Sequence, residues 1–255
     1  RPKNNKTKPR IKHRPFLKWA GGKFRLTDDL NRVFPKRKQC LIEPFVGAGA
    51  VFLNSHFERY ILADINPDLI NLFNIVKENV DAYIEACKPI FFAENANTAD
   101  YYYAQRDAFN QSSDPFERSV LFLYLNRFGF NGLCRYNSKN EFNVPFGAYK
   151  THYFPEDELR YFAHKAQSAV FLCADFQQTF ELADKHSVIY CDPPYAPLPQ
   201  DTNFTGYAGN AFGLEHQKNL AECAKKAQKE KQISVVISNH DTKFTREIYK
   251  GAKFK

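Results

Sequence analysis

The segment from Ser187 to Leu198 places an acid, two prolines and a tyrosine directly after an apolar run, in the order S-V-I-Y-C-D-P-P-Y-A-P-L. Proline donates no backbone hydrogen bond and holds φ near one value, so the carbonyl groups of such a turn stay free and rigidly aimed. An exocyclic amine on a heteroaromatic ring is a weak nucleophile. Two acceptors on its hydrogens would favour a tetrahedral nitrogen with an available lone pair. The candidate catalytic residues are Asp192, Pro193, Pro194 and Tyr195.

In this interpretation the Asp192 carboxylate and the Pro193 carbonyl accept from the amine, and Tyr195 offers a flat surface on which a base could stack. A base inside a duplex cannot reach such a pocket, so it has to be flipped out of the helix. The alternative is a proline turn that closes a strand, with Asp192 as a cap. A second ligand-binding pattern upstream favours the chemical interpretation.

That second pattern is a glycine-containing turn, E-P-F-V-G-A-G-A, which follows the apolar run that ends at Glu43. Glycine at Gly47 and Gly49 allows positive φ and a close approach of the backbone to a ligand. Asp64 comes fifteen residues after Gly49, at the end of the next apolar run, where an acid can accept hydrogen bonds from ribose hydroxyls. The alternative is a tight turn followed by a helix-capping Asp64.

Two common phosphate-binding motifs are absent from these segments. Phe52 occupies the third glycine position of G-x-G-x-x-G, which argues against a pyrophosphate and favours a smaller ligand that carries adenosine. The segment F-L-K-W-A-G-G-K, which ends at Lys23, lacks the spacing of a P-loop, and Phe24 replaces its hydroxyl residue.

The elements that would position these residues alternate between strand and helix, which predicts an α/β fold with a parallel sheet. The predicted strands are 40–43, 60–64, 169–173, 187–191 and 233–238. Helices are predicted from about Ala50, over 177–183 and over 214–229. Between about 67 and 164 the chain becomes rich in Tyr, Phe, Asn and Arg, and only 116–126 has a clear helical pattern. We interpret this region as an inserted domain.

The inserted region contains flat rings, amides and guanidinium groups on either side of a polar Ser138-Lys139-Asn140 tip, which predicts a hairpin over about 126–147. Arginine bonded to guanine and asparagine bonded to adenine are favoured contacts in the major groove, and an aromatic wedge can fill the gap left by a flipped base. The alternative is an aromatic-rich hairpin that packs only on its own domain.

The net charge of +8 favours a polyanionic partner such as nucleic acid. The first fourteen residues carry seven Lys or Arg and no acid, which predicts a disordered basic arm, either contacting phosphates or aiding solubility. No apolar run reaches the roughly 18 residues of a membrane helix. Six scattered cysteines without a C-x-x-C pair indicate no disulfide framework or zinc site, and a reducing cytosol is the simplest location.

Four motifs in order, W-A-G-G-K, E-P-F-V-G-A-G, A-D-I-N and D-P-P-Y, resemble the DNA adenine methylase (Dam) family of the D12/alpha group, from Phe16 to the end of the chain. The resemblance implies a Rossmann-like fold that uses S-adenosylmethionine to methylate adenine N6 in double-stranded DNA, with no metal. It implies a catalytic domain from 15–66 and 165–255, a target-recognition domain from 67–164, and an enzyme that acts as a monomer in a bacterial-type cytosol or nucleoid.

The resemblance also carries over residue roles. The implied cofactor-binding residues are Trp19, Lys23, Phe45, Gly47, Gly49, Asp64 and Asp192, with Lys23 suited to the cofactor carboxylate. The hairpin would read GATC sites. Lys18 and Arg135 would contact guanines, Leu133 and Pro145 would touch bases, and Phe130 and Asn131 would lie where the base is flipped out. Phe130 stands where relatives often have Tyr.

The sequence departs from the family pattern in two places. Ala148 stands where some relatives carry Arg, and the chain ends at Lys255, where relatives continue into the last strands of the sheet. The alternative function is therefore a GATC-binding protein with impaired catalysis. An RNA or protein-amide methyltransferase is a further alternative, against which Asp rather than Asn at 192 counts. For His240 we favour a structural or pocket-lining role over acid–base chemistry.

Overall fold

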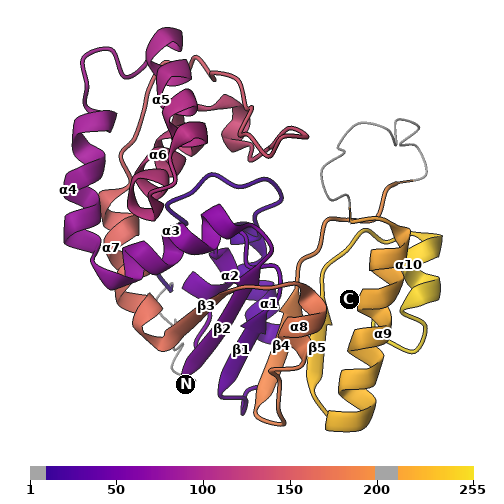
Figure 1. The fold of residues 1–255 in the computed structure, drawn as a ribbon. Coiled ribbons are helices and arrows are strands. Elements are labelled where there is room, and N and C mark those ends of the chain that lie inside the picture. The colour runs from indigo at the N-terminus through magenta and orange to yellow at the C-terminus, as the bar shows by residue number, and fades with distance from the viewer. Residues whose placement is uncertain (1–9, 199–211) are drawn as a thin grey trace, which may run out of the picture.

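The computed structural model describes residues 10–198 and 212–255, and its centre is a parallel sheet of five strands in the order β3-β2-β1-β4-β5 (Figure 1). The strands are β1 Cys40–Glu43, β2 Arg59–Asp64, β3 Ala169–Cys173, β4 Ser187–Cys191 and β5 Ser234–Ile237. All five predicted strands are present, and the predicted α/β class is confirmed.

The order of the strands creates a switch point at the centre of the sheet. Ile42 of β1 pairs with Ile61 of β2 on one side and with Ile189 of β4 on the other. Every residue of β1 and β4 is buried, as expected for parallel strands covered on both faces. In open α/β sheets, ligands bind outside the carboxyl ends of the strands at such a point. The fold therefore places a site beside Glu43 and Asp192.

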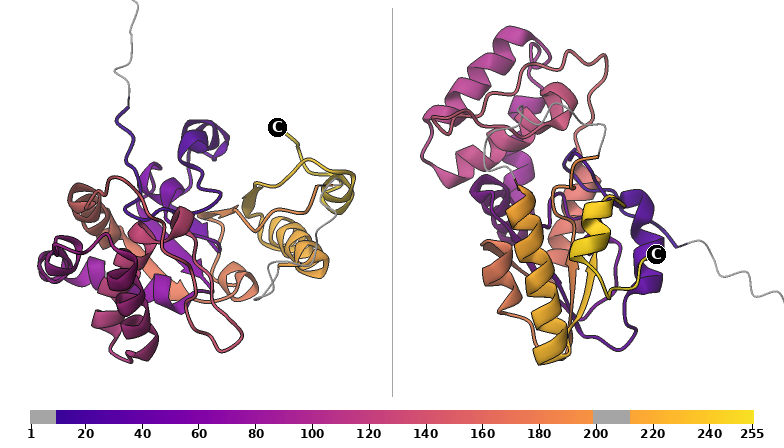
Figure 2. Two further views of the ribbon diagram at one scale, coloured as in Figure 1. Left: turned by 90° about the horizontal axis from the view of Figure 1, so that it is seen from above. Right: turned by 90° about the vertical axis from the view of Figure 1, so that its right-hand side faces the viewer.

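Seven helices lie outside the region from 67 to 165 in the described part of the chain, and all but α9 are short. They are η1 Phe24–Leu26, α1 Thr27–Val33, α2 Ala50–Leu53, η3 Ala166–Ser168, α8 Phe176–Phe180, α9 Leu214–Lys231 and α10 Lys243–Ile248. The helix predicted near Ala50 is confirmed, although it spans a single turn. The helix predicted over 177–183 ends earlier, at Phe180. Helices α9 and α10 lie at the β5 end of the sheet, away from α3 to α7, and α8 packs against α9 (Figure 2).

The region from 67 to 165 contains five α-helices, where the sequence predicted one. They are α3 Pro67–Glu78, α4 Val80–Phe91, α5 Ala99–Gln111, α6 Pro115–Phe128 and α7 Glu156–Lys165, with a 3-10 turn η2 Phe130–Gly132. Helix α6 corresponds to the predicted helix. Side-chain caps begin four of the five, at Asn66, Asn79, Thr98 and Asp114. Asn, Thr and Asp are residue types that favour the first position of a helix, so these starts could be recognised in the sequence. The prediction missed them because the region is so rich in aromatic residues.

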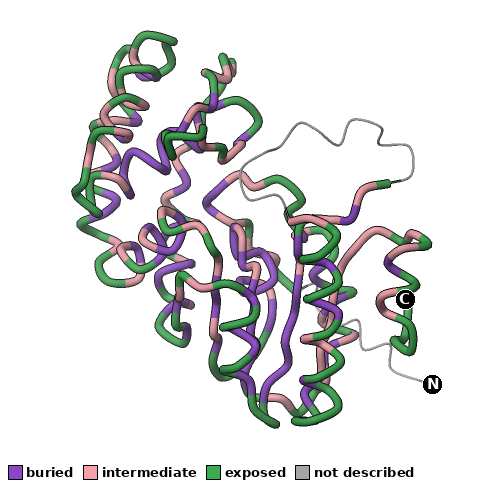
Figure 3. Tube along the Cα trace, turned by 45° about the vertical axis from the view of Figure 1, so that its right-hand side comes forward, coloured by how far each residue is buried: buried purple, intermediate pink, exposed green. Residues whose placement is uncertain are grey.

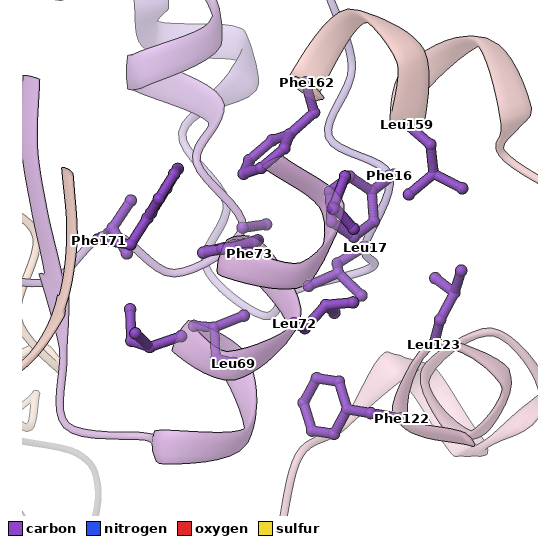
Figure 4. Packing of buried hydrophobic residues seen from close by; sticks show 14 of the residues in the cluster. Phe16, Leu17, Leu69, Leu72, Phe73, Phe122, Leu123, Leu159, Phe162 and Phe171 are labelled. Atoms are coloured by element: carbon purple, nitrogen blue, oxygen red, sulfur yellow. The ribbon is translucent and has the colours of Figure 1, made fainter. Parts of the chain in front are cut away.

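The sheet and the helical region share one hydrophobic core. The ring of Phe162 in α7 lies 4.8 Å from that of Phe73 in α3 and 5.6 Å from that of Phe171 in β3, measured between centroids. Figure 4 shows these rings together with Phe16 and Leu17 from the segment that precedes η1. In Figure 3 the buried parts of the trace run from the strands into the neighbouring helices. Packing therefore holds the helical region directly against β2 and β3.

The described part of the N-terminal arm is packed rather than disordered. The Lys12 ammonium lies 2.8 Å from the Asp28 carboxylate. The backbone of His13 exchanges two hydrogen bonds of 2.8 Å with the Asn54 side chain, and its ring stacks on Tyr161 at 3.5 Å between centroids. The prediction of disorder is therefore wrong for these residues, and residues 1–9 of the arm lie outside the described chain. Within the described ranges, no helix is long and apolar enough to span a membrane.

Candidate active site

Three acids gather at the carboxyl edge of the sheet because three neighbouring parallel strands end there. Glu43 is the last residue of β1, Asp64 is the last of β2, and Asp192 directly follows β4. We call this region the acidic edge. It brings the glycine turn and the D-P-P-Y segment together, although about 140 residues separate them in the sequence.

A buried ion pair joins the first and last motifs at the acidic edge. The Lys23 ammonium lies 2.9 Å from a carboxylate oxygen of Asp192 and 4.6 Å from the centre of the Tyr195 ring. It also donates a hydrogen bond of 2.5 Å to the Gly21 carbonyl. The side chain of Lys23 is only 9% exposed, so the pair is poorly screened by water. Three sequence-predicted site residues, Lys23, Asp192 and Tyr195, are therefore in contact.

Burial and pairing act in opposite directions on these two groups. Burial raises the pKa of Asp192, and the adjacent Lys23 ammonium lowers it again in part. Burial also lowers the pKa of Lys23, but hydrogen bonding to Tyr195 and Asp192 outweighs burial, so the Lys23 pKa lies above its ordinary value. The lysine therefore stays charged at neutral pH, and Asp192 has a cation beside it.

The D-P-P-Y turn is held in place from α9 and from the segment after β5. Gln217 of α9 donates a hydrogen bond of 2.7 Å to the Pro194 carbonyl and accepts one of 2.9 Å from the Asn239 amide. The Asn239 side-chain oxygen accepts from the Ala196 N–H at 2.9 Å. No hydrogen bond from a described residue reaches the Pro193 carbonyl. The turn is thus fixed while this acceptor stays available.

His240 also supports the turn. Its Nδ1 lies 2.7 Å from the Ala196 carbonyl oxygen, and its ring meets the Tyr195 ring edge to face at 4.8 Å between centroids. Tyr195 is therefore confined between His240 and Lys23.

The glycine turn brings Trp19 next to Asp64. Gly47 has φ of +52°, and a Cβ added there would lie 3.1 Å from the Trp19 Cδ1 and Nε1 atoms. The Gly47 N–H donates to Asp64 at 3.3 Å, and the Asn66 N–H donates to the other carboxylate oxygen at 3.0 Å. Burial raises the pKa of Asp64, and these two hydrogen bonds oppose that rise. A glycine is required here by both conformation and space.

The remaining two cofactor candidates have other contacts. Phe45 packs its ring against Phe176 and Phe212, with centroid distances of 5.8 and 5.6 Å. Gly49 has φ of +85° and occupies the N-cap position of α2. Phe45 can therefore form an apolar wall, whereas Gly49 shapes the start of the helix.

Glu43 belongs to the acidic edge and was missed as a site residue by the sequence reasoning. Its side chain is buried, and no described residue bonds to its Oε2 atom. Burial, and then the negative charge of Asp192, raise the pKa of Glu43 well above its ordinary value. The available signal was an acid inside the E-P-F motif at the end of a fully apolar strand. Among the described residues, no group of three or more His, Cys, Asp or Glu side chains could hold a metal ion.

The predicted hairpin is present but starts later than predicted, because α6 continues to Phe128. Two isolated antiparallel bridges, Gly129 with Phe146 and Tyr136 with Phe142, define the segment that we call the hairpin 129–147. It lies on the same side of the molecule as the carboxyl ends of the strands (Figure 1).

Polar and apolar groups of the hairpin are open to solvent. Arg135 donates from Nε to the Asn143 side-chain oxygen at 2.9 Å and from NH2 to the Asn143 carbonyl at 3.2 Å. The Phe130 side chain is 47% exposed, and Asn131 is exposed with φ of +54°. Pro145 is exposed and Leu133 is half-buried.

Lys18 reaches the hairpin from the N-terminal segment. Its backbone exchanges hydrogen bonds of 2.8 and 2.7 Å with the Asn126 side chain, and its ammonium lies 4.2 Å from the centre of the Tyr149 ring. A Cβ added to Gly132 would lie 2.4 Å from the Lys18 Cβ. Burial, and then the Arg127 charge, lower the pKa of Lys18. Lys18 and Trp19, neighbours in sequence, thus connect the hairpin with the acidic edge.

Comparisons with known proteins identify the family of the chain. The family model of the D12 class N6 adenine-specific DNA methyltransferases matches residues 19–255, which include all four motifs. The DNA adenine methylase of Haemophilus influenzae is 82% identical over 255 residues, or 100% of this chain and 89% of that protein. Those of Vibrio cholerae and Escherichia coli K12 are each 59% identical over 242 residues, or 95% of this chain and 87% and 86% of theirs.

Proposed function

Because the chain belongs to the D12 class of N6 adenine-specific DNA methyltransferases, we propose that it transfers the methyl group of S-adenosylmethionine to an adenine flipped out of duplex DNA at GATC sites. Adenine methylation of DNA follows from the family. The cofactor, the flipped base and the GATC site are the content of the proposal. The observation that carries it is the contact of Lys23, Asp192 and Tyr195 at the acidic edge.

The residues present fit the cofactor. Asp64 can accept from ribose hydroxyls at the switch point, and the Trp19 ring, which packs directly on Gly47 beside Asp64, offers a flat face to an adenosine group. Lys23 would contact the cofactor carboxylate, with Asp192 beside it. When bound, S-adenosylmethionine supplies an electrophilic methyl group.

The residues of the D-P-P-Y turn would then orient the target amine. The Asp192 carboxylate and the Pro193 carbonyl, to which no described residue donates, accept its two N–H groups, and Tyr195 stacks on the base. Orientation of two reactants is worth about 7–11 kcal/mol of an activation barrier in favourable cases. Strong base catalysis is not needed, because the amine proton can leave after the nitrogen has become cationic.

The hairpin 129–147 and Lys18 would contact the DNA. Arg135 and Lys18 would bond to guanines, Leu133 and Pro145 would touch bases, and Phe130 and Asn131 would occupy the place of the flipped adenine. The exposure of Phe130 and Asn131 supports this role, as does the net charge of +8.

A radiolabelled methyl-transfer assay tests the proposal on two duplexes, one with GATC and one with the same bases scrambled. We expect incorporation into the GATC duplex alone, with label at adenine N6. Equal incorporation into both would overturn the site preference. Tight binding to GATC without incorporation would support the binding function instead. A 2-aminopurine at the target position should brighten on binding, and an unchanged signal would contradict flipping.

A further inference from the structure

A half-buried acid outside the acidic edge, Asp68 in the first turn of α3, bonds to two distant parts of the chain. It accepts a hydrogen bond of 2.7 Å from the Tyr136 hydroxyl of the hairpin. Its other oxygen accepts from the Arg118 NH2 and Nε groups of α6 at 2.9 and 3.2 Å. The side chain of Asp68 is only 12% exposed. Charged hydrogen bonds of this length in a poorly solvated place are among the stronger ones in proteins.

The segment that contains Asp68 begins at Asp64, which belongs to the acidic edge. Asn66 lies two residues after Asp64, bonds to it through its backbone N–H at 3.0 Å, and caps α3 by accepting from the Asp68 N–H at 2.9 Å. The Asn66 side-chain amide also points to the hairpin, with its nitrogen 3.3 Å from the Cys134 sulfur. Cys134 and Tyr136, the two neighbours of Arg135, are therefore both held by the five residues that begin at Asp64.

The returning arm of the hairpin is held from a different element. The Asn110 side chain of α5 accepts from the Phe142 N–H at 2.8 Å and donates to the Phe142 carbonyl at 3.0 Å. One turn and two turns earlier on the same helix face, Arg106 and Tyr102 donate to the Val144 carbonyl at 3.1 and 2.8 Å. Side chains of α5 thus form hydrogen bonds with backbone groups of this arm that a neighbouring strand would otherwise form.

Arg135 and Asn143, which bond to each other across the hairpin, therefore lie between two anchors. The α5 anchor holds the arm with Asn143 relative to the helical region. The Asp68 anchor holds the arm with Arg135 relative to the acidic edge. The Asp68 anchor and the neighbouring Asn66–Cys134 contact connect the hairpin to the strand end that carries Asp64.

We infer that Asp68 is a positioning residue which, through the Tyr136 hydroxyl, sets the place of Arg135 relative to the acidic edge and so determines how well the enzyme discriminates a guanine in its site. The inference rests on the proposed function, because it takes Arg135 to contact a base. Loss of the bond removes one of the contacts that hold the arm with Arg135 and leaves Asp64, Lys23 and Asp192 in place.

The test is Tyr136→Phe, which removes only the hydroxyl, together with Asp68→Asn, which removes the charge. We expect the ratio of kcat/KM for GATC to that for a duplex with one guanine replaced to fall about 3- to 10-fold, part of the discrimination that one arginine–guanine contact supplies. The dissociation constant of S-adenosylmethionine should change by less than about twofold. The matched control is Tyr153→Phe, which removes an exposed hydroxyl whose bonds to Glu158 are 3.0 and 3.1 Å long.

Hydrogen exchange gives a readout that does not depend on turnover. The Asn137 and Asn143 N–H groups bond across the hairpin at 2.9 and 3.0 Å, and their exchange should become several-fold faster in Tyr136→Phe while exchange in α6 is unchanged. Unchanged discrimination, or an equal loss on both duplexes and on cofactor binding, would overturn the inference. A wild-type enzyme that transfers no methyl group would refute the proposed function instead, and exchange would still decide whether Asp68 anchors the hairpin.

Discussion

The acidic edge and the hairpin 129–147 are built in different ways, although both contain residues proposed to act on the substrate. The acidic edge consists of strand ends in a parallel sheet, its side chains are buried or half-buried, and Asp192 pairs there with Lys23. The hairpin has two isolated bridges of its own. Side chains from α3 and α5 supply many of its remaining backbone and hydroxyl bonds.

This difference predicts how each of the two regions should respond to substitutions. Burial makes each charge at the acidic edge depend on its partner, because an unpaired buried charge is costly. The exposed groups of the hairpin can lose a contact at smaller cost, since water replaces it. We therefore expect substitutions at the acidic edge to stop the reaction or change stability, and those in the hairpin to change which DNA is chosen.

The largest effect is expected for Asp192→Ala, which removes an acceptor for the target amine and leaves the Lys23 ammonium without its carboxylate. We expect the single-turnover rate of methyl transfer to fall by about 10²–10³-fold or more, the usual loss for one oriented polar group. The matched control is Asp241→Ala, which removes a 65% exposed carboxylate paired with Arg246 and should leave the rate near that of the wild type. Similar losses of rate in both variants would show that Asp192 has no specific role in methyl transfer.

Arg135→Ala should change the discrimination between DNA sequences rather than the rate of methyl transfer. We expect discrimination at one base pair to fall by about 1–3 kcal/mol, measured as kcat/KM on GATC and on duplexes with single substitutions. Lys139→Ala at the exposed tip is the control, and it should leave the preference unchanged. A uniform loss on all sequences would mark Arg135 as a phosphate contact instead.

Gly47→Ala tests two separate effects, the strain of a positive φ and the contact of the new methyl group with the Trp19 ring. The positive φ alone should cost about 1–2 kcal/mol of unfolding free energy, and the close Trp19 atoms should weaken cofactor binding in addition. Gly251→Ala is the matched control, because Gly251 has φ of +95° and nothing within 4 Å of an added Cβ. If both variants lose the same stability and keep the wild-type cofactor affinity, the close packing of Trp19 on Gly47 has no role in cofactor binding.

The smallest effect is expected from the pH dependence that Glu43 confers. Its raised pKa means that the folded chain keeps a proton which the unfolded chain releases above about pH 4.3. Its contribution to stability therefore falls as pH rises through that window. Relative to wild type, Glu43→Gln should gain stability progressively as the pH rises above about 4.3, by at most about 1.4 kcal/mol per pH unit, in urea unfolding.

Glu222→Gln controls for the loss of one negative charge, since that side chain is 75% exposed. A gap between wild type and Glu43→Gln that does not widen with pH would show that Glu43 is ionised in the folded protein.

The sheet was predictable because short apolar runs bounded by turn residues have few alternatives. The strands 40–43, 169–173 and 187–191 have the predicted bounds. Most helices between 67 and 165 were missed, because α5 presents polar and aromatic residues on several faces and α6 is buried on nearly all of its own. The packing of His13 on Tyr161 was also missed, since a basic, apolar-poor segment normally has nothing to bury.

By itself the sequence determined the family, the parallel sheet and the identity of the acidic residues that end its strands, because these depend on local patterns and on motifs in order. Only the tertiary structure decided which of these groups are paired. One oxygen of Glu43 has no partner among the described residues. Lys23 meets Asp192 across 169 residues of chain, and Asp68 bonds to a tyrosine 68 residues away. Such pairings arise from the parallel order of the strands and the packing of α3, which bring distant residues into one poorly solvated place.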